Sequence, residues 1–87
     1  MKHFAAPSFW EGYGRVPANI QKLADHCYDL LKSNPRHPSL HFKKIGKYHS
    51  VRVGLHYRAL AVDLPEGLLW FWIGTHDEYQ RMIRESG

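Results

Sequence analysis

The sequence contains one cysteine, Cys27, and no long apolar run. A single thiol cannot close a disulfide within the chain, which favours a reducing compartment. The N-terminal residues lack the apolar stretch of a signal peptide, and the longest apolar run, Leu68 to Ile73, is far too short to span a bilayer. We therefore expect a cytoplasmic protein with no membrane partner.

Acidic residues are missing from the middle of the chain, between Asp29 and Asp63. The same stretch holds four of the seven histidines and seven of the twelve Lys and Arg residues: Lys32, Arg36, Lys43, Lys44, Lys47, Arg52 and Arg58. Cations without neighbouring carboxylates create a local positive field, which favours a polyanionic partner such as RNA. The alternative is an ordinary solvated basic surface that has no partner.

The length and apolar content indicate one folded domain over residues 1–87. With 87 residues the chain can build one core but not two, and 44% of its residues are hydrophobic. Three Trp, five Tyr and four Phe supply large side chains for that core.

The clearest predicted element is an amphipathic helix over residues 17–33. Its apolar side chains recur at steps of three and four residues: Ile20, Leu23, Ala24, Cys27, Leu30 and Leu31. Pro17 suits the first turn, and Pro35 ends the helix. Before it we expect a strand at residues 2–6. Ser8 and Glu11 have the spacing of a capping box, which predicts a short helical turn that Gly12 and Gly14 stop.

Strands dominate the second half. Residues 35–47 read as a basic loop with a short strand around residues 40–44. Alternation predicts strands at residues 50–53 and 57–64, and residues 68–74 are apolar on both faces, as in a central strand. Asp77 to Arg84 is expected to form a short helix. The predicted fold is therefore α+β, with helices packed on a small antiparallel sheet.

Several segments, in this order, resemble the RelE/ParE superfamily, the toxins of type II toxin–antitoxin systems. They are Asn34-Pro35, His37-Pro38-Ser39-Leu40, the pair of segments Arg52-Val53-Gly54 and Tyr57-Arg58-Ala59-Leu60, and Ile73-Gly74-Thr75-His76-Asp77-Glu78-Tyr79. The resemblance covers nearly the whole chain. It implies helices on an antiparallel sheet and a cognate antitoxin as partner. It also implies one of two activities: cleavage of ribosome-bound mRNA, or inhibition of DNA gyrase by protein contact.

The resemblance also implies site residues. Arg52 and Arg58 match basic positions on the middle strands, whereas His76 and Tyr79 match a region that is catalytic in the nucleases. Metal-free RNA cleavage needs phosphate binding and proton transfer, which arginine and histidine can supply. We assign phosphate binding to Arg52 and Arg58, proton transfer to His76, and stacking or acid assistance to Tyr79.

Two further lysines, Lys43 and Lys44, are assigned to the flanking RNA backbone. Each assigned residue also has a structural alternative. The arginines can be outward strand residues paired with Asp63 or Glu66, His76 can cap the sheet, and the lysines can belong to a solvated loop. Tyr79 can be a core residue if its ring packs against the long helix.

No His or Cys spacing resembles a zinc site, so we expect no metal and no cofactor. Three functions remain open: an mRNA endonuclease, a gyrase inhibitor, and a degenerate member that binds only an antitoxin. The arginines together with His76 favour the metal-independent, ribosome-dependent mRNA endonuclease, which is the function we expect. Ser50 stands where some family members carry a lysine, which favours the two non-nucleolytic alternatives. Trp70 and Trp72 are candidate stacking platforms for bases, with the core or an antitoxin-binding surface as the alternative.

Overall fold

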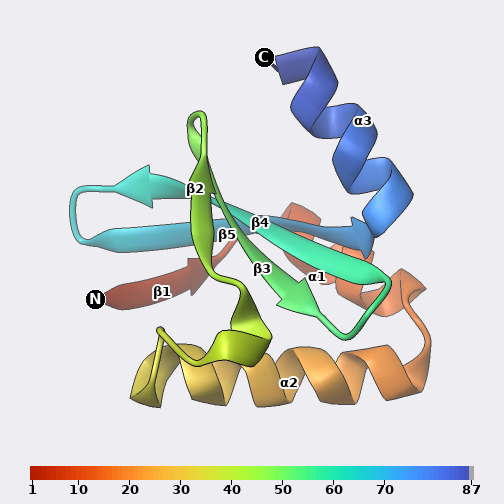
Figure 1. Ribbon diagram of the computed structural model, residues 1–87, viewed down its shortest axis with the longest axis horizontal. Helices are drawn as coiled ribbons and strands as arrows, with labels where there is room; N and C mark the ends of the chain where they lie inside the picture. Colours follow the sequence, from red (N-terminus) through yellow and green to blue (C-terminus); the bar gives the residue numbers. More distant parts are fainter. Residues whose placement is uncertain (87) are drawn as a thin grey trace.

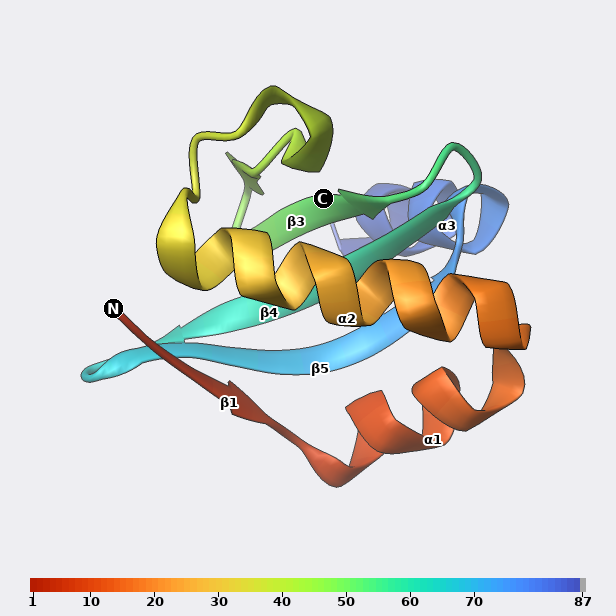
Figure 2. The ribbon, with the colours of Figure 1, turned by 90° about the horizontal axis from the view of Figure 1, so that it is seen from below.

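The computed structural model describes residues 1–86 and contains one five-stranded sheet with helices on both faces (Figures 1 and 2). The strands lie in the order β1-β5-β4-β3-β2. Their bounds are β1 Lys2–Ala5, β2 Lys43–Ile45, β3 Tyr48–Val53, β4 Tyr57–Leu64 and β5 Gly67–Thr75. The predicted α+β fold is confirmed, with one addition: β1 joins the antiparallel strands in parallel to β5, so the sheet is mixed.

Helix α2 (Ala18–Ser33) is the amphipathic helix that the sequence predicts, and it lies along one face of the sheet (Figure 2). Ile20 and Leu31 are buried, whereas Leu23, expected in the same stripe, is 39% exposed. Pro17 precedes the helix as its N-cap residue instead of lying in its first turn. Its fixed φ still suits that place, because an N-cap residue keeps an extended backbone.

Helix α1 (Pro7–Arg15) lies beside α2 and covers β5, and it differs from the prediction. The capping box is wrong: the Ser8 hydroxyl makes no cap and instead donates to the carbonyl of Phe71, at 2.7 Å. The helix also continues through Gly12 and Gly14. Gly12 is required there because a Cβ at this position would lie 2.8 Å from the carbonyl oxygen of Ile73.

The loop after α2 is more ordered than expected. Pro38–Leu40 forms a 3-10 turn, η1, and the short strand β2 begins at Lys43, not around Leu40. Leu40 is fully buried, so the turn anchors the basic loop on the core. The side chain of His37 accepts a hydrogen bond from the backbone N–H of Ser39, which closes the start of the turn.

Helix α3 (His76–Ser86) follows β5 without a loop and lies on the face of the sheet opposite to α2 (Figure 1). Glu78 caps its start by accepting hydrogen bonds from both the backbone N–H and the hydroxyl of Thr75. These bonds lower the pKa of the Glu78 carboxyl. No helix within residues 1–86 has the length and apolar character needed to cross a membrane.

The two faces of the sheet therefore have different neighbours. Val51, Val53, Ala59 and Ile73 point toward α1 and α2 and belong to the main apolar core. Because side chains alternate along a strand, Arg52 and Arg58 project from the other face, the one that α3 flanks. The main core thus occupies one face, and the other face carries the arginine pair together with a smaller buried group that includes Leu60 and Tyr79.

Candidate functional site

Two arginines form the centre of the candidate site. Arg52 on β3 and Arg58 on β4 are direct partners in the antiparallel ladder, so their side chains leave the same face of the sheet next to each other. Both side chains are half-buried. Burial and the neighbouring charge of Arg52 lower the pKa of Arg58. Like charges placed opposite each other repel, so the pair is costly unless an anion or other contacts compensate it.

Arg52 is held by two acceptors. Its Nε donates to the carbonyl oxygen of Gly54 at 3.3 Å, and its Nη1 lies 3.1 Å from Nε2 of His41. His41 comes from the end of the η1 turn, ahead of β2. The sequence gives no signal for this role of His41, because the contact joins a turn and a strand and depends on how they pack.

Arg58 lies over α3. Its guanidinium carbon is 5.8 Å from the centre of the Tyr79 ring, within the range of a cation–π contact. The rings of Tyr79 and His76 are also 5.8 Å apart. Tyr79 is only 4% exposed, so it is a core residue, but it packs beside Arg58 and not against the long helix.

A hollow of about 340 Å³ opens beside Arg58, where β4 and β5 meet α3. It is lined by Leu55, His56, Tyr57, Arg58, Thr75, His76 and Asp77. The chain is fixed here by the backbone N–H of His76, which donates to the carbonyl of His56 at 2.8 Å. The His76 ring lies 3.3 Å from the amide nitrogen of Gln80. His76 and Arg58 therefore share one hollow, and Arg52 borders Arg58 on the other side.

The two predicted lysines, Lys43 and Lys44, lie on opposite faces of the sheet. Lys43 pairs with Ser50 across β2 and β3, so it shares the face of Arg52. Lys44 projects to the opposite face and forms an ion pair with Asp63 at 3.6 Å. His49 binds the same carboxylate at 2.9 Å and lowers the pKa of Asp63. Asp63 is therefore occupied by Lys44 and His49, not by the arginines.

The burial of Ser50, Trp70 and Trp72 bears on the roles that the sequence suggested for these positions. Ser50 is 1% exposed and lies between Lys43 and Leu60 in the ladder, so its side chain is buried within the sheet. Trp70 is 6% exposed and belongs to the core, so it is no stacking platform. Trp72 is half-buried on the other face, where its ring occupies the space that a side chain at Gly74 would need.

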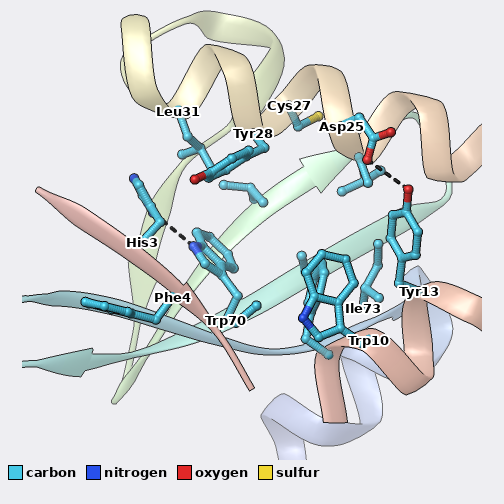
Figure 3. A pocket seen from close by; sticks show the side chains of 16 residues that line it. His3, Phe4, Trp10, Tyr13, Asp25, Cys27, Tyr28, Leu31, Trp70 and Ile73 are labelled. Carbon is cyan, nitrogen blue, oxygen red and sulfur yellow. Dashed lines mark hydrogen bonds between the residues drawn. The ribbon is translucent and has the colours of Figure 1, made fainter. Parts of the chain in front are cut away.

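A second, larger hollow of about 420 Å³ lies between α1, α2 and β1 (Figure 3). Figure 3 shows Trp10, Tyr28 and Phe4 around a floor that includes Trp70. Its walls are mostly apolar, and Trp10 remains 56% exposed. The polar contacts are few: the Tyr13 hydroxyl donates to Asp25 at 2.9 Å, and the Trp70 ring N–H donates to Nδ1 of His3 at 3.0 Å. The hollow has no arrangement of acid, base and cation.

Within residues 1–86, no three His, Cys, Asp or Glu side chains are grouped so that they could hold a metal ion. The Cys27 thiol faces the sheet, donates to the carbonyl of Arg52 at 3.4 Å, and has a pKa raised by burial. A thiol with a raised pKa is a poor nucleophile at neutral pH.

Comparisons with known proteins bear on the fold and the family of the chain. No curated protein sequence matches the chain. Among solved structures, the chain is similar to the crystal structure of the RelB–RelE antitoxin–toxin complex from Methanococcus jannaschii, with a TM-score of 0.71 and 20% identity. The alignment covers 91% of this chain and 96% of that one, and it supports the fold. The model of the ParE-like toxin domain matches residues 18–81, which include the arginine pair, His76 and Tyr79. The chain therefore belongs to the ParE-like toxin domain family.

Proposed function

We propose that the protein is the toxin of a toxin–antitoxin pair and acts as a metal-independent, ribosome-dependent mRNA endonuclease. The observation that carries this proposal is the alignment of Arg52 and Arg58 on one face, with His76 in the hollow beside Arg58. Two adjacent guanidinium groups suit a phosphate, because each can donate two hydrogen bonds to its oxygens.

The proposed reaction is an attack by the RNA's own 2′-hydroxyl on the adjacent phosphorus. A base takes the proton of the 2′-hydroxyl, the new O–P bond forms a 2′,3′-cyclic phosphate, and the bond to the 5′-oxygen breaks as that oxygen gains a proton. Arg52 and Arg58 stabilise the crowded phosphate, and His76 transfers a proton. Tyr79 supports Arg58 from beneath, since its buried ring is poorly placed to stack on a base.

Lys43 extends the cationic face toward β2, where it can hold the RNA backbone next to the cleaved bond. Lys44 has no such part in this proposal, because it lies on the opposite face and is paired with Asp63. The partner in the cell is a cognate antitoxin. The proposal of an antitoxin partner is based on the structural relative from Methanococcus jannaschii, which is an antitoxin–toxin complex.

Purified protein, added to ribosomes programmed with a defined mRNA, tests the nuclease activity. We expect cleavage within translated codons, with a 2′,3′-cyclic phosphate on one fragment and a 5′-hydroxyl on the other. Mapping of transcript 5′ ends after induction in cells gives the matching test in vivo. Intact mRNA in both assays contradicts the proposal.

A second candidate function, inhibition of DNA gyrase by protein contact, is favoured by one observation. Ser50 is buried where some nuclease relatives carry a lysine, so the face has no cation between Lys43 and Arg52. A gyrase inhibitor is expected to induce a DNA-damage response while cellular mRNA stays intact. The same induction experiment therefore separates the two functions.

A further inference from the structure

His41 has an unusual backbone for a residue with a side chain. Its φ of 45° and ψ of 42° place it in the left-handed region, and among residues 1–86 it is the one non-glycine residue with positive φ. This conformation costs roughly 1 kcal/mol for a residue that carries a Cβ. Strain of this kind persists only where the surroundings fix it, and it is concentrated at functional sites.

The side chain of His41 reaches the arginine pair from that strained position. Nη1 of Arg52 lies 3.1 Å from Nε2 of His41. A guanidinium has donors only, so Nε2 accepts, the imidazole is neutral, and its proton sits on Nδ1. The carbonyl of Gly54 accepts from Nε of the same guanidinium. Neither contact uses Nη2 of Arg52, so this nitrogen can still donate a hydrogen bond to a phosphate oxygen.

A neutral acceptor can hold Arg52 in place without reducing the positive charge of the arginine pair. Arg52 and Arg58 are direct partners in the ladder and repel each other. A carboxylate beside Arg52 would hold it in place but would also cancel the charge that a phosphate needs. The imidazole of His41 orients the guanidinium and leaves its full charge.

We propose that His41 is a positioning residue that holds Arg52 for an RNA phosphate through a neutral hydrogen bond. The inference rests on the proposed function for the identity of the anion. His41 does not have to touch the RNA, since its effect passes through Arg52.

Three variants of the full chain separate this role from a structural one. His41→Gly removes the imidazole and relieves the strain of the left-handed backbone. If His41 only shaped the turn, this variant would therefore keep the activity of the wild type. We expect His41→Gly to lower kcat/KM for ribosome-bound mRNA about tenfold while stability is kept or increased. His41→Gln, which retains an acceptor, restores most of the loss. His41→Glu retains an acceptor but adds a negative charge, and stays impaired.

Coupling to Arg52 is the second readout. In an Arg52→Gln background, His41→Gly is expected to cause less than a twofold further loss, because the group that it positions is gone. Equal losses in both backgrounds, or a His41→Gly variant as active as wild type, overturn the inference.

Binding of a short single-stranded RNA oligonucleotide keeps the inference separate from the nuclease proposal. If wild type binds this RNA without cutting mRNA, the nuclease proposal fails, and the same variant series read by affinity still decides the role of His41. If wild type does not bind the RNA, the positioning of Arg52 for an RNA phosphate is overturned as well.

Discussion

Arg52 and Arg58 face each other across β3 and β4, and neither takes part in the ion pairs found within residues 1–86. Those pairs join Lys32 to Asp29, and Lys44 and His49 to Asp63. Two adjacent guanidinium groups without a carboxylate are chemically suited to an external anion, which in the proposed function is an RNA phosphate. The pairing is possible because the hairpin places both side chains on the face away from the core.

Replacement of Arg58 tests whether this pair is the centre of toxicity. We expect Arg58→Ala to abolish growth arrest while the thermal unfolding midpoint changes by only a few degrees, because the side chain is half-buried and pairs with no carboxylate. Growth after induction and circular dichroism measure the two effects. Arg36→Ala is the matched control, since Arg36 lies with Leu31 and Lys32 beside α2. Undiminished toxicity of Arg58→Ala removes this residue from the site.

His76 is expected to act in the chemical step. His76→Gln should lower the single-turnover cleavage rate at least tenfold and change RNA affinity less than threefold, because glutamine can bind but cannot transfer a proton at neutral pH. Rapid-quench cleavage and equilibrium binding measure these quantities separately. Equal losses in both would make His76 a binding residue.

Lys43 and Lys44 are adjacent in sequence but lie on opposite faces of the sheet, so the same substitution can be compared on the two faces. Lys43→Ala should weaken RNA binding severalfold and reduce its salt dependence, because one phosphate contact is lost. Lys44→Ala should change affinity by less than twofold, since that side chain is on the other face with Asp63. Titrations at two salt concentrations give both values. The same loss in the two variants would mean that the RNA does not distinguish the faces.

Two glycines of α1 make a matched pair for the packing of that helix. A methyl group at Gly12 would press on the Ile73 carbonyl, so Gly12→Ala is expected to destabilise the protein by about 1–3 kcal/mol. At Gly14 nothing lies within 4 Å of the added Cβ, and Gly14→Ala is expected to stabilise by up to about 1 kcal/mol. Chemical denaturation measures both, and destabilisation by Gly14→Ala would contradict the packing of α1.

His3 should make stability sensitive to mild acid. Burial, the N-terminal amino group and Lys32 lower the pKa of His3 below its ordinary value of 6.5. The unfolded chain therefore binds a proton more readily, and stability falls as the pH drops below about 6.5. His3→Asn retains an acceptor for the Trp70 ring and cannot be protonated. It should lose less stability than wild type between pH 7.5 and 5. Parallel losses in denaturation curves would exclude this role for His3.

The sequence predicts most elements because their signals are local. The apolar stripe of α2 and the alternation in β3 and β4 depend on residues a few positions apart. The capping box predicted at Ser8 is wrong because a tertiary contact competes for the side chain: the Ser8 hydroxyl donates to the carbonyl of Phe71, far along the chain. The position of β2 depends likewise on its ladder with β3.

For the site, the sequence alone determined the residue types: a stretch without carboxylates, rich in arginine, lysine and histidine, within a family pattern. Only the tertiary structure decided which of them meet. Strand register brings Arg52 to Arg58 and separates Lys43 from Lys44, because a shift of one residue turns a side chain to the opposite face. The contact between His41 and Arg52 arises from a turn and a strand that pack together, and no spacing in the chain encodes it.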